Sequence, residues 1–202
     1  MPKKPTQPFG HIAFSKSGKV TKHQFELPDD KSGQELAAIR HFARKRIADL
    51  LPEQIVRLPE NDNDFEIKLT DGSSIIVELT ELVRRDYMER VSQQDYDKGR
   101  FRYVASDASG AIWRVDDERK GLVLGEKIVS KLRYPKPQGK LFWLLIWTIE
   151  SEFRYFWHEG GKSYENEAVH RARAKIVEIQ KFPFDEVWVT NLELNPHRIW
   201  PH

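Results

Sequence analysis

The clearest pattern in this chain is an alternation of apolar and polar residues over positions 64–80. A period of two predicts two β-strands, 64–70 and 73–80, joined as an antiparallel hairpin. Both apolar sets fall at odd numbers, so the loop must hold an odd number of residues, and either 70–72 or 71–73 satisfies this. The apolar side chains that we expect to face the core are Phe65, Ile67, Leu69, Ile75, Val77 and Leu79.

The two possible loops differ in the carboxylates that they place opposite each other. With the first loop, Asp64 lies directly opposite Glu78, with Cβ atoms about 5 Å apart. With the second loop, Glu66 lies opposite Glu78. In either register these three carboxylates share one face of the hairpin with Thr80.

Apolar residues recur at three- and four-residue spacing in three further segments, which predicts three amphipathic helices. The first begins at the cap residue Ser32, has Glu35 at the capping-box spacing and ends before Pro52. The second covers about residues 118–134. The third lies within residues 163–182.

Two strongly apolar segments, 141–149 and 186–192, predict strands that are buried on both faces, as parallel strands are. The resulting order indicates an α/β fold with a mixed central sheet flanked by helices. The first 25 residues predict a loosely packed arm or an edge strand, and residues 84–115 show no assignable pattern. Because no flexible linker divides the chain, we expect one domain over residues 1–202.

Composition narrows the class of protein. The 202 residues include no cysteine, which excludes disulfide scaffolds and thiol nucleophiles, and the seven histidines lack metal-ligand spacing. Motifs typical of phosphate loops, dinucleotide sites and serine hydrolases are absent from the sequence. The longest apolar run has about nine residues, too few to span a bilayer, and the N-terminus lacks the apolar run of a signal peptide. We therefore expect a cytoplasmic protein without a membrane partner.

The net charge of +2 is small, but the charges are unevenly distributed. Residues 118–140 carry seven basic and two acidic side chains, and residues 40–46 add four basic ones. Residues 60–66 carry four acids and no base. Such a distribution suits a metal site that faces a phosphate backbone, although ordinary solvated helix faces and a polar turn give the same pattern.

The paired carboxylates of the hairpin are the best candidates for chemistry. Like charges on adjacent strands destabilise a sheet, and a bound divalent cation reverses that effect. Hard oxygen ligands suit Mg²⁺, which can activate water toward a phosphodiester. The alternative is that Asp64 and Glu78 are solvated strand residues.

The order of these features resembles the PD-(D/E)XK nuclease superfamily, whose fold is restriction-endonuclease-like. The resemblance covers residues 32–149 and is carried by Glu35 in the first helix, Asp64 at the start of a strand, and Glu78 after a tight turn. It implies that Asp64 and Glu78 bind Mg²⁺ or Mn²⁺ and that Leu79 offers its backbone carbonyl. It also implies that Glu35 is the acid presented by the first helix, where a capping role is the alternative.

The family's lysine stands two positions after the second acid, where this chain has Thr80, and the family's proline before the aspartate is replaced by Asn63. Some family members carry the lysine on a neighbouring helix. The resemblance therefore implies that Lys131 or Lys127 takes that role here. The periodicity of the second helix places these two lysines on one flank, with Ile128, Val129 and Leu132 facing inward.

The sequence thus predicts a divalent-metal-dependent nuclease, with a catalytically inactive nucleic-acid- or partner-binding module of the same fold as the alternative. An α/β domain unrelated to nucleases is a third possibility. DNA is favoured over RNA as the partner, and a homodimer is possible. The residues expected to hold phosphates are Arg40, Arg44, Lys127 and Arg133.

Overall fold

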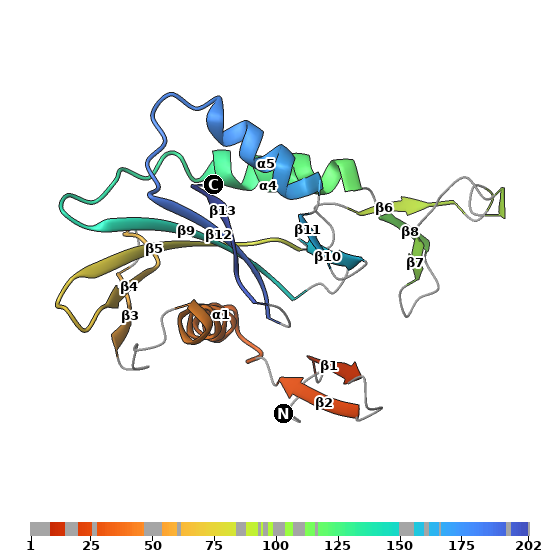
Figure 1. The fold of residues 1–202 in the computed structure, drawn as a ribbon, viewed down its shortest axis with the longest axis horizontal. Helices are drawn as coiled ribbons and strands as arrows, with labels where there is room; N and C mark the ends of the chain where they lie inside the picture. Colours follow the sequence, from red (N-terminus) through yellow and green to blue (C-terminus); the bar gives the residue numbers. More distant parts are fainter. Residues whose placement is uncertain are drawn as a thin grey trace.

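The computed structural model describes residues 9–14, 20–25, 28–46, 54–59, 62–83, 88–92, 94, 97–98, 104–106, 112–115, 117–149, 156–159, 162–165, 167–192 and 195–201. Its main feature is a six-stranded mixed sheet with the strand order β13-β12-β9-β5-β4-β3 (Figure 1). The strands are β3 (Ile55–Arg57), β4 (Phe65–Lys68), β5 (Ser74–Glu81), β9 (Leu141–Thr148), β12 (Glu186–Asn191) and β13 (His197–Trp200).

The sheet has a parallel centre and antiparallel edges. Strands β5, β9 and β12 run parallel, whereas β3, β4 and β13 each pair antiparallel with a neighbour. Parallel neighbours need crossover connections, and helices α4 (Asp117–Ser130) and α5 (Glu167–Val177) lie within these connections, side by side over one face. Helix α1 (Lys31–Arg46) covers the other face (Figure 1). The predicted α/β fold with a mixed sheet is confirmed.

Because helices cover both faces, the sheet separates two apolar cores. The odd-numbered residues of β4 and β5 pack against α1, where Phe42 is fully buried. Even-numbered residues such as Ile76 pack against α4 and α5. Strand β9 contributes to both cores, and all its residues except Leu141 are buried, as expected for a central parallel strand.

The hairpin forms in the first of the two registers. Phe65 pairs with Val77, and the Leu69 N–H donates a hydrogen bond to the Ser73 carbonyl at 2.8 Å. The loop is therefore 70–72. Gly72 has a φ of 83°, a left-handed conformation that glycine adopts without a Cβ clash. The predicted burial of the odd-numbered side chains holds for the residues within both strands.

Three details of the predicted helices were wrong. Helix α1 is capped by Asp30 rather than Ser32, because the Gly33 N–H donates to Asp30 Oδ1 at 2.7 Å. Helix α4 ends at Ser130, and residues 131–134 form turns. Val129 is 40% exposed, since it faces away from the sheet. The part of the first helix expected over residues 47–51 lies outside the described residues.

Three smaller sheets complete the described structure. Strands β1 (Phe9–Phe14) and β2 (Val20–Phe25) pair with each other and add no edge strand to the main sheet. None of the described helices has the length and hydropathy needed to cross a membrane. The remaining strands are β6 (Met88–Val91), β7 (Val104–Ser106), β8 (Ile112–Val115), β10 (Phe156–Glu159) and β11 (Lys162–Glu165).

Candidate functional site

The candidate site lies where β5 extends past the beginning of β4. Strand β4 starts at Phe65, whereas β5 continues to Glu81. Asp64 stands at this step, and its Oδ2 accepts a 2.6 Å hydrogen bond from the Leu79 N–H. The carboxylate of Asp64 thus accepts a hydrogen bond from β5 where a backbone carbonyl of a neighbouring strand would otherwise accept it. The donor, Leu79, is the residue that follows Glu78.

Glu78 is 2% exposed, because its side chain lies on the face of β5 that α4 and α5 cover. The alternative interpretation of Glu78 as a solvated strand residue is therefore wrong. Lys131, in the turn after α4, donates a hydrogen bond from Nζ to Glu78 Oε1 at 2.6 Å. The lysine side chain is itself only 18% exposed, so the two groups form a largely buried ion pair.

The electrostatics of Glu78 are dominated by burial. Removal from water raises the pKa of Glu78 above its ordinary value, and the nearby charge of Asp64 raises it further. The hydrogen bond from Lys131 opposes both effects but does not cancel them. The two carboxylates thus influence each other, as the hairpin register predicts.

A small pocket of about 240 Å³ opens beside this pair. Glu35 from α1 and Lys127 from α4 both contribute to its lining, together with Lys131 and Thr80. Neither Glu78 nor Asp64 lines the pocket itself. The structure therefore brings Asp64, Glu78 and Lys131 close together, although they are far apart in the sequence. It places Glu35 and Lys127 at the adjoining pocket.

Glu35 is not a capping partner. Its carboxylate forms ion pairs with Arg57 of β3 at 3.0 Å and with Lys31, one turn earlier in α1, at 3.7 Å. Arg57 also lies over the ring of Phe65, 4.6 Å from its centroid. Sequence reasoning missed Arg57, because β3 has only three residues and gives no measurable periodicity.

The predicted phosphate contacts divide into two groups. Arg133 is exposed in the turn that carries Lys131, and its charge acts on Glu78. Arg40 and Arg44 are exposed on α1, but they lie about 140° and 180° around the helix axis from Glu35. The structure therefore does not bring these two arginines to the pocket that Glu35 lines.

The donor set suits a hard cation, although it is small. Among the described residues there is no group of three or more His, Cys, Asp or Glu side chains that could hold a metal ion. Glu78 Oε2, however, is buried without a hydrogen-bond partner in the described structure. An orphaned carboxylate oxygen is costly, and a cation that binds it would offset that cost.

The raised pKa of Glu78 gives a testable pH dependence. Because the folded protein favours protonated Glu78, this group's contribution to stability is present below about pH 4.5 and is lost as pH rises through the raised pKa. Relative to the wild type, Glu78→Gln should therefore gain stability as pH increases from about 4 to about 7. Urea denaturation at a series of pH values measures this difference.

Glu66→Gln is the matched control for this pH series. Hydrogen bonds from Lys140 and Ser74 lower the pKa of Glu66, so its stabilisation is present above about pH 4.5 and is lost as pH falls. The Glu66 variant should lose stability relative to the wild type as pH rises toward about 4.5, below the interval in which the Glu78 variant gains it. Parallel pH profiles for the two variants would contradict the buried position of Glu78.

The chain matches no known protein family, no curated protein and no solved structure.

Proposed function

We propose that this protein is a divalent-metal-dependent nuclease that hydrolyses nucleic-acid phosphodiesters, with a restriction-endonuclease-like fold. The observation that carries the proposal is the contact between Lys131 and Glu78 next to Asp64. Two carboxylates and an ammonium group from three separate segments lie near one another at the step where β5 extends past β4. Two acidic strand residues with a nearby lysine are the minimal set that the resemblance implies.

Asp64 and Glu78 would hold the cation, with the free Oε2 of Glu78 as the available ligand atom. The backbone carbonyl of Leu79 is the implied third oxygen. Bound there, Mg²⁺ or Mn²⁺ would supply Lewis acidity toward a phosphodiester oxygen and water. Lys131 already neutralises the charge of Glu78 through Oε1. The two carboxylates together therefore keep one negative charge, that of Asp64, for the cation.

Lys131 supplies what Thr80 cannot. An ammonium group stabilises negative charge that develops on a phosphate oxygen and can hold or release a proton, whereas a hydroxyl at the threonine position provides no charge. The burial of Lys131 strengthens these interactions, since they act in a region of low dielectric. The lysine lies on the turn after α4, so it reaches Glu78 from the helical layer and not from β5 itself.

The adjoining pocket is suited to an anion. Its lining includes the ammonium groups of Lys31, Lys127 and Lys131, against the carboxylates of Glu35 and Glu81. A volume of about 240 Å³ accommodates a phosphate with part of its sugar but not a large apolar ligand. Lys127 and Arg133 would hold phosphates on either side of Lys131.

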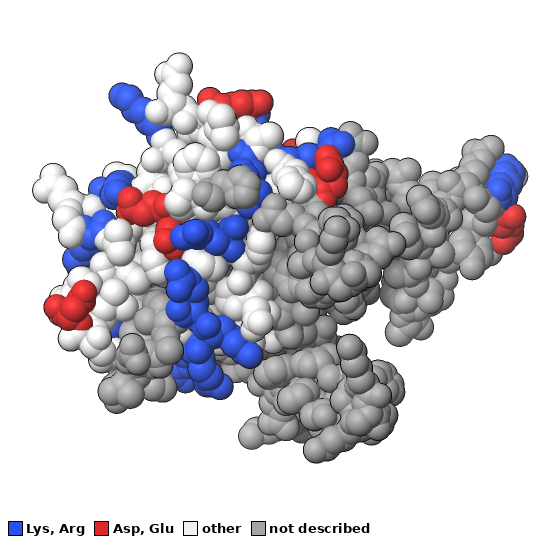
Figure 2. All heavy atoms as spheres, viewed as in Figure 1, with Lys and Arg blue, Asp and Glu red and all other residues white. Residues whose placement is uncertain are grey.

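Basic side chains also gather away from this pocket. Figure 2 shows a band of Lys and Arg side chains over the part of the molecule where Figure 1 shows α1 and the β12–β13 edge. Arg46 lies 4.9 Å from the ring centroid of Trp188, and Arg198 lies 5.9 Å from it. Together with Arg40 and Arg44, these residues favour a polyanionic partner larger than a mononucleotide.

Calorimetric titration with Mg²⁺ and Mn²⁺ tests the proposal. The wild type should release or take up heat at millimolar metal, and Asp64→Asn should abolish that heat, because the amide lacks the charge that a hard cation needs. Melting temperature is a poorer assay, since millimolar metal on a millimolar site stabilises the fold by only about 0.4 kcal/mol. Asp62→Asn, an exposed acid two positions earlier, is the matched control and should bind metal normally.

A cleavage assay on duplex and single-stranded oligonucleotides completes the test. Metal-dependent hydrolysis that Asp64→Asn removes supports the nuclease. Metal or nucleic-acid binding without hydrolysis favours the inactive binding module. If the wild type binds no divalent cation at millimolar concentration, the nuclease proposal fails.

A further inference from the structure

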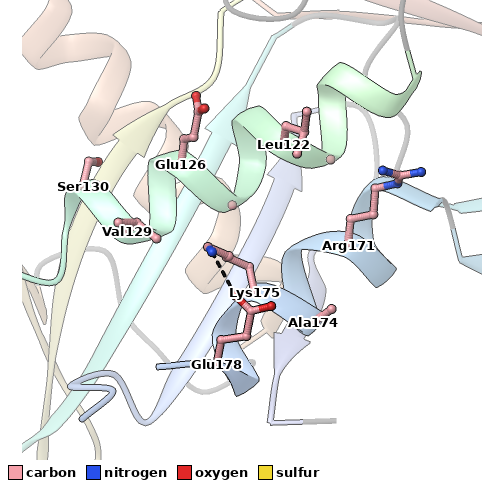
Figure 3. A pocket seen from close by; sticks show the side chains of 10 residues that line it. Leu122, Glu126, Val129, Ser130, Arg171, Ala174, Lys175 and Glu178 are labelled. Atoms are coloured by element: carbon pink, nitrogen blue, oxygen red, sulfur yellow. Dashed lines mark hydrogen bonds and ion pairs between the residues drawn. The ribbon is translucent and has the colours of Figure 1, made fainter. Parts of the chain in front are cut away.

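A second, larger cavity lies on the opposite side of the helical layer from the sheet. It is a groove of about 640 Å³ between α4 and α5 (Figure 3). Leu122 and Val129 line it from α4, and they are 56% and 40% exposed. Arg171 and Lys175 line it from α5, and Glu178 lines it from the turn that follows α5. Solvent-exposed apolar residues flanked by charges are typical of an interaction surface.

Two glycines fix how the helices are aligned. A Cβ at Gly121 would lie 3.0 Å from Arg171 Cβ, and one at Gly125 would lie 3.6 Å from Lys175 Cβ. The helices therefore run parallel, and each α4 residue is level with the α5 residue fifty positions later in the chain.

The side chains that line the groove have a two-fold pattern. Leu122 and Val129 are seven residues apart and so share one face of α4. Arg171 of α5 and Glu178, in the turn directly after α5, are of opposite charge and have the same spacing. The midpoints of the two pairs differ in level by one residue, or about 1.5 Å along the helices. A single two-fold axis that is perpendicular to both helices would therefore pass close to the midpoints of both pairs of residues.

We propose that the α4–α5 face is an interface with a second copy of this chain. Rotation about that axis places Leu122 over Val129 of the second copy, and Arg171 over Glu178 of the second copy, with each contact made twice. An isologous interface needs such self-complementarity, which a surface of one charge would lack. The proposal does not rest on nuclease activity, since the groove lies on the far side of α4 and α5 from the sheet.

The charges at the axis itself oppose the dimer. Glu126 of α4 and Lys175 of α5 lie within one residue of level with each other, and the rotation brings each of them close to the same residue of the second copy. These like-charge contacts limit the strength of the dimer, and the charge attraction comes from the outer pairs. Within one chain, Arg171 pairs with Glu167 at 3.1 Å and Lys175 pairs with Glu178 at 2.9 Å. These pairs are exposed and weakly held, so Arg171 and Glu178 can exchange partners across the interface.

The size of the face sets the strength of the dimer. Two helices of 14 and 11 residues present about 400 Å² per copy, roughly half of what a standard stable interface buries. The dimer should therefore be weak and populated only at high protein concentration. It would form at high local concentration, for example when two copies bind one extended ligand.

Sedimentation equilibrium up to about 1 mM protein tests the interface. Arg171→Glu and Glu178→Arg should each weaken dimerisation at least about 10-fold, because each places like charges together twice across the axis. The double variant Arg171→Glu/Glu178→Arg should restore dimerisation to within about 3-fold of the wild type. Thermal unfolding checks that all three variants remain folded.

Apolar truncations provide the second arm of the test. Val129→Ala should weaken the dimer, whereas Val177→Ala, which is 70% exposed on α5 but does not line the groove, should leave it unchanged. A wild type that stays monomeric at 1 mM overturns the proposal. A dimer that is insensitive to both single charge swaps, or that the double swap fails to restore, overturns it equally.

Discussion

Lys131→Met should lower the rate of phosphodiester hydrolysis by at least about 100-fold while leaving the heat of Mg²⁺ binding in place. The ammonium group is 2.6 Å from Glu78 Oε1, so it is positioned at the carboxylates, but it is not itself an oxygen ligand. Methionine keeps the length and the apolar stem of the side chain. Single-turnover cleavage and calorimetry on the same preparation measure the two effects separately.

Lys127→Met is the matched control for this experiment. Lys127 lines the same pocket, one helical turn earlier, and is expected to hold phosphate. Its loss should weaken substrate binding and reduce hydrolysis by no more than about 10-fold. A larger loss of hydrolysis for Lys127→Met than for Lys131→Met would assign the catalytic role to Lys127. Loss of metal binding in Lys131→Met would show that the lysine acts on the fold of the site.

Lys131→Met should also lower the free energy of unfolding by about 3 kcal/mol at neutral pH, because it leaves the carboxylate of Glu78 buried and unpaired. The double variant Glu78→Leu/Lys131→Met should recover most of that loss, since neither charge remains. Urea denaturation of the four proteins in this cycle gives the coupling energy.

The ion pair between Lys140 and Glu66 is the control cycle. It has the same length of 2.6 Å, but Lys140 is 42% exposed, against 18% for Lys131. Solvent screening should limit its coupling energy to about 1 kcal/mol. Equal coupling energies for the two pairs would show that burial does not strengthen the contact between Lys131 and Glu78.

The register of the hairpin was predictable because it depends only on parity and on a short loop. Alternation of apolar residues on both strands left two registers, and the structure has the one in which Gly72 is the last loop residue and adopts a positive φ. The contact between Asp64 and the Leu79 backbone follows directly from that register.

The burial of Glu78 was not predicted, although the sequence carried a signal for it. Ile76 is apolar and lies on the same face of β5 as Glu78, which indicates that helices cover this face too. Because Ile76 departs from the strict alternation, the alternation alone classifies this face as polar. A carboxylate on a covered face needs a partner, and that requirement would have directed attention to the lysines after α4.

The placement of basic residues on α1 illustrates a second limit. A count of Arg and Lys over residues 40–46 ignores the side of the helix on which each residue lies. Helical geometry places Arg40 and Arg44 on a different side of the helix from Glu35. The long-range choice of Arg57 as the partner of Glu35 depends on how β3 packs beside α1. Three residues of strand give no pattern from which that packing could be predicted.

The hydrogen bond from the Leu79 N–H to Asp64 also satisfies a backbone donor at an edge of β5. Where β4 stops, β5 would otherwise offer an open backbone donor to any extended chain, and such open edges promote strand addition. A carboxylate at this position occupies the donor and repels the carbonyl oxygens of an incoming strand. Asp64 therefore stabilises the folded chain by itself, and its replacement by an apolar residue should expose a sheet edge prone to aggregation.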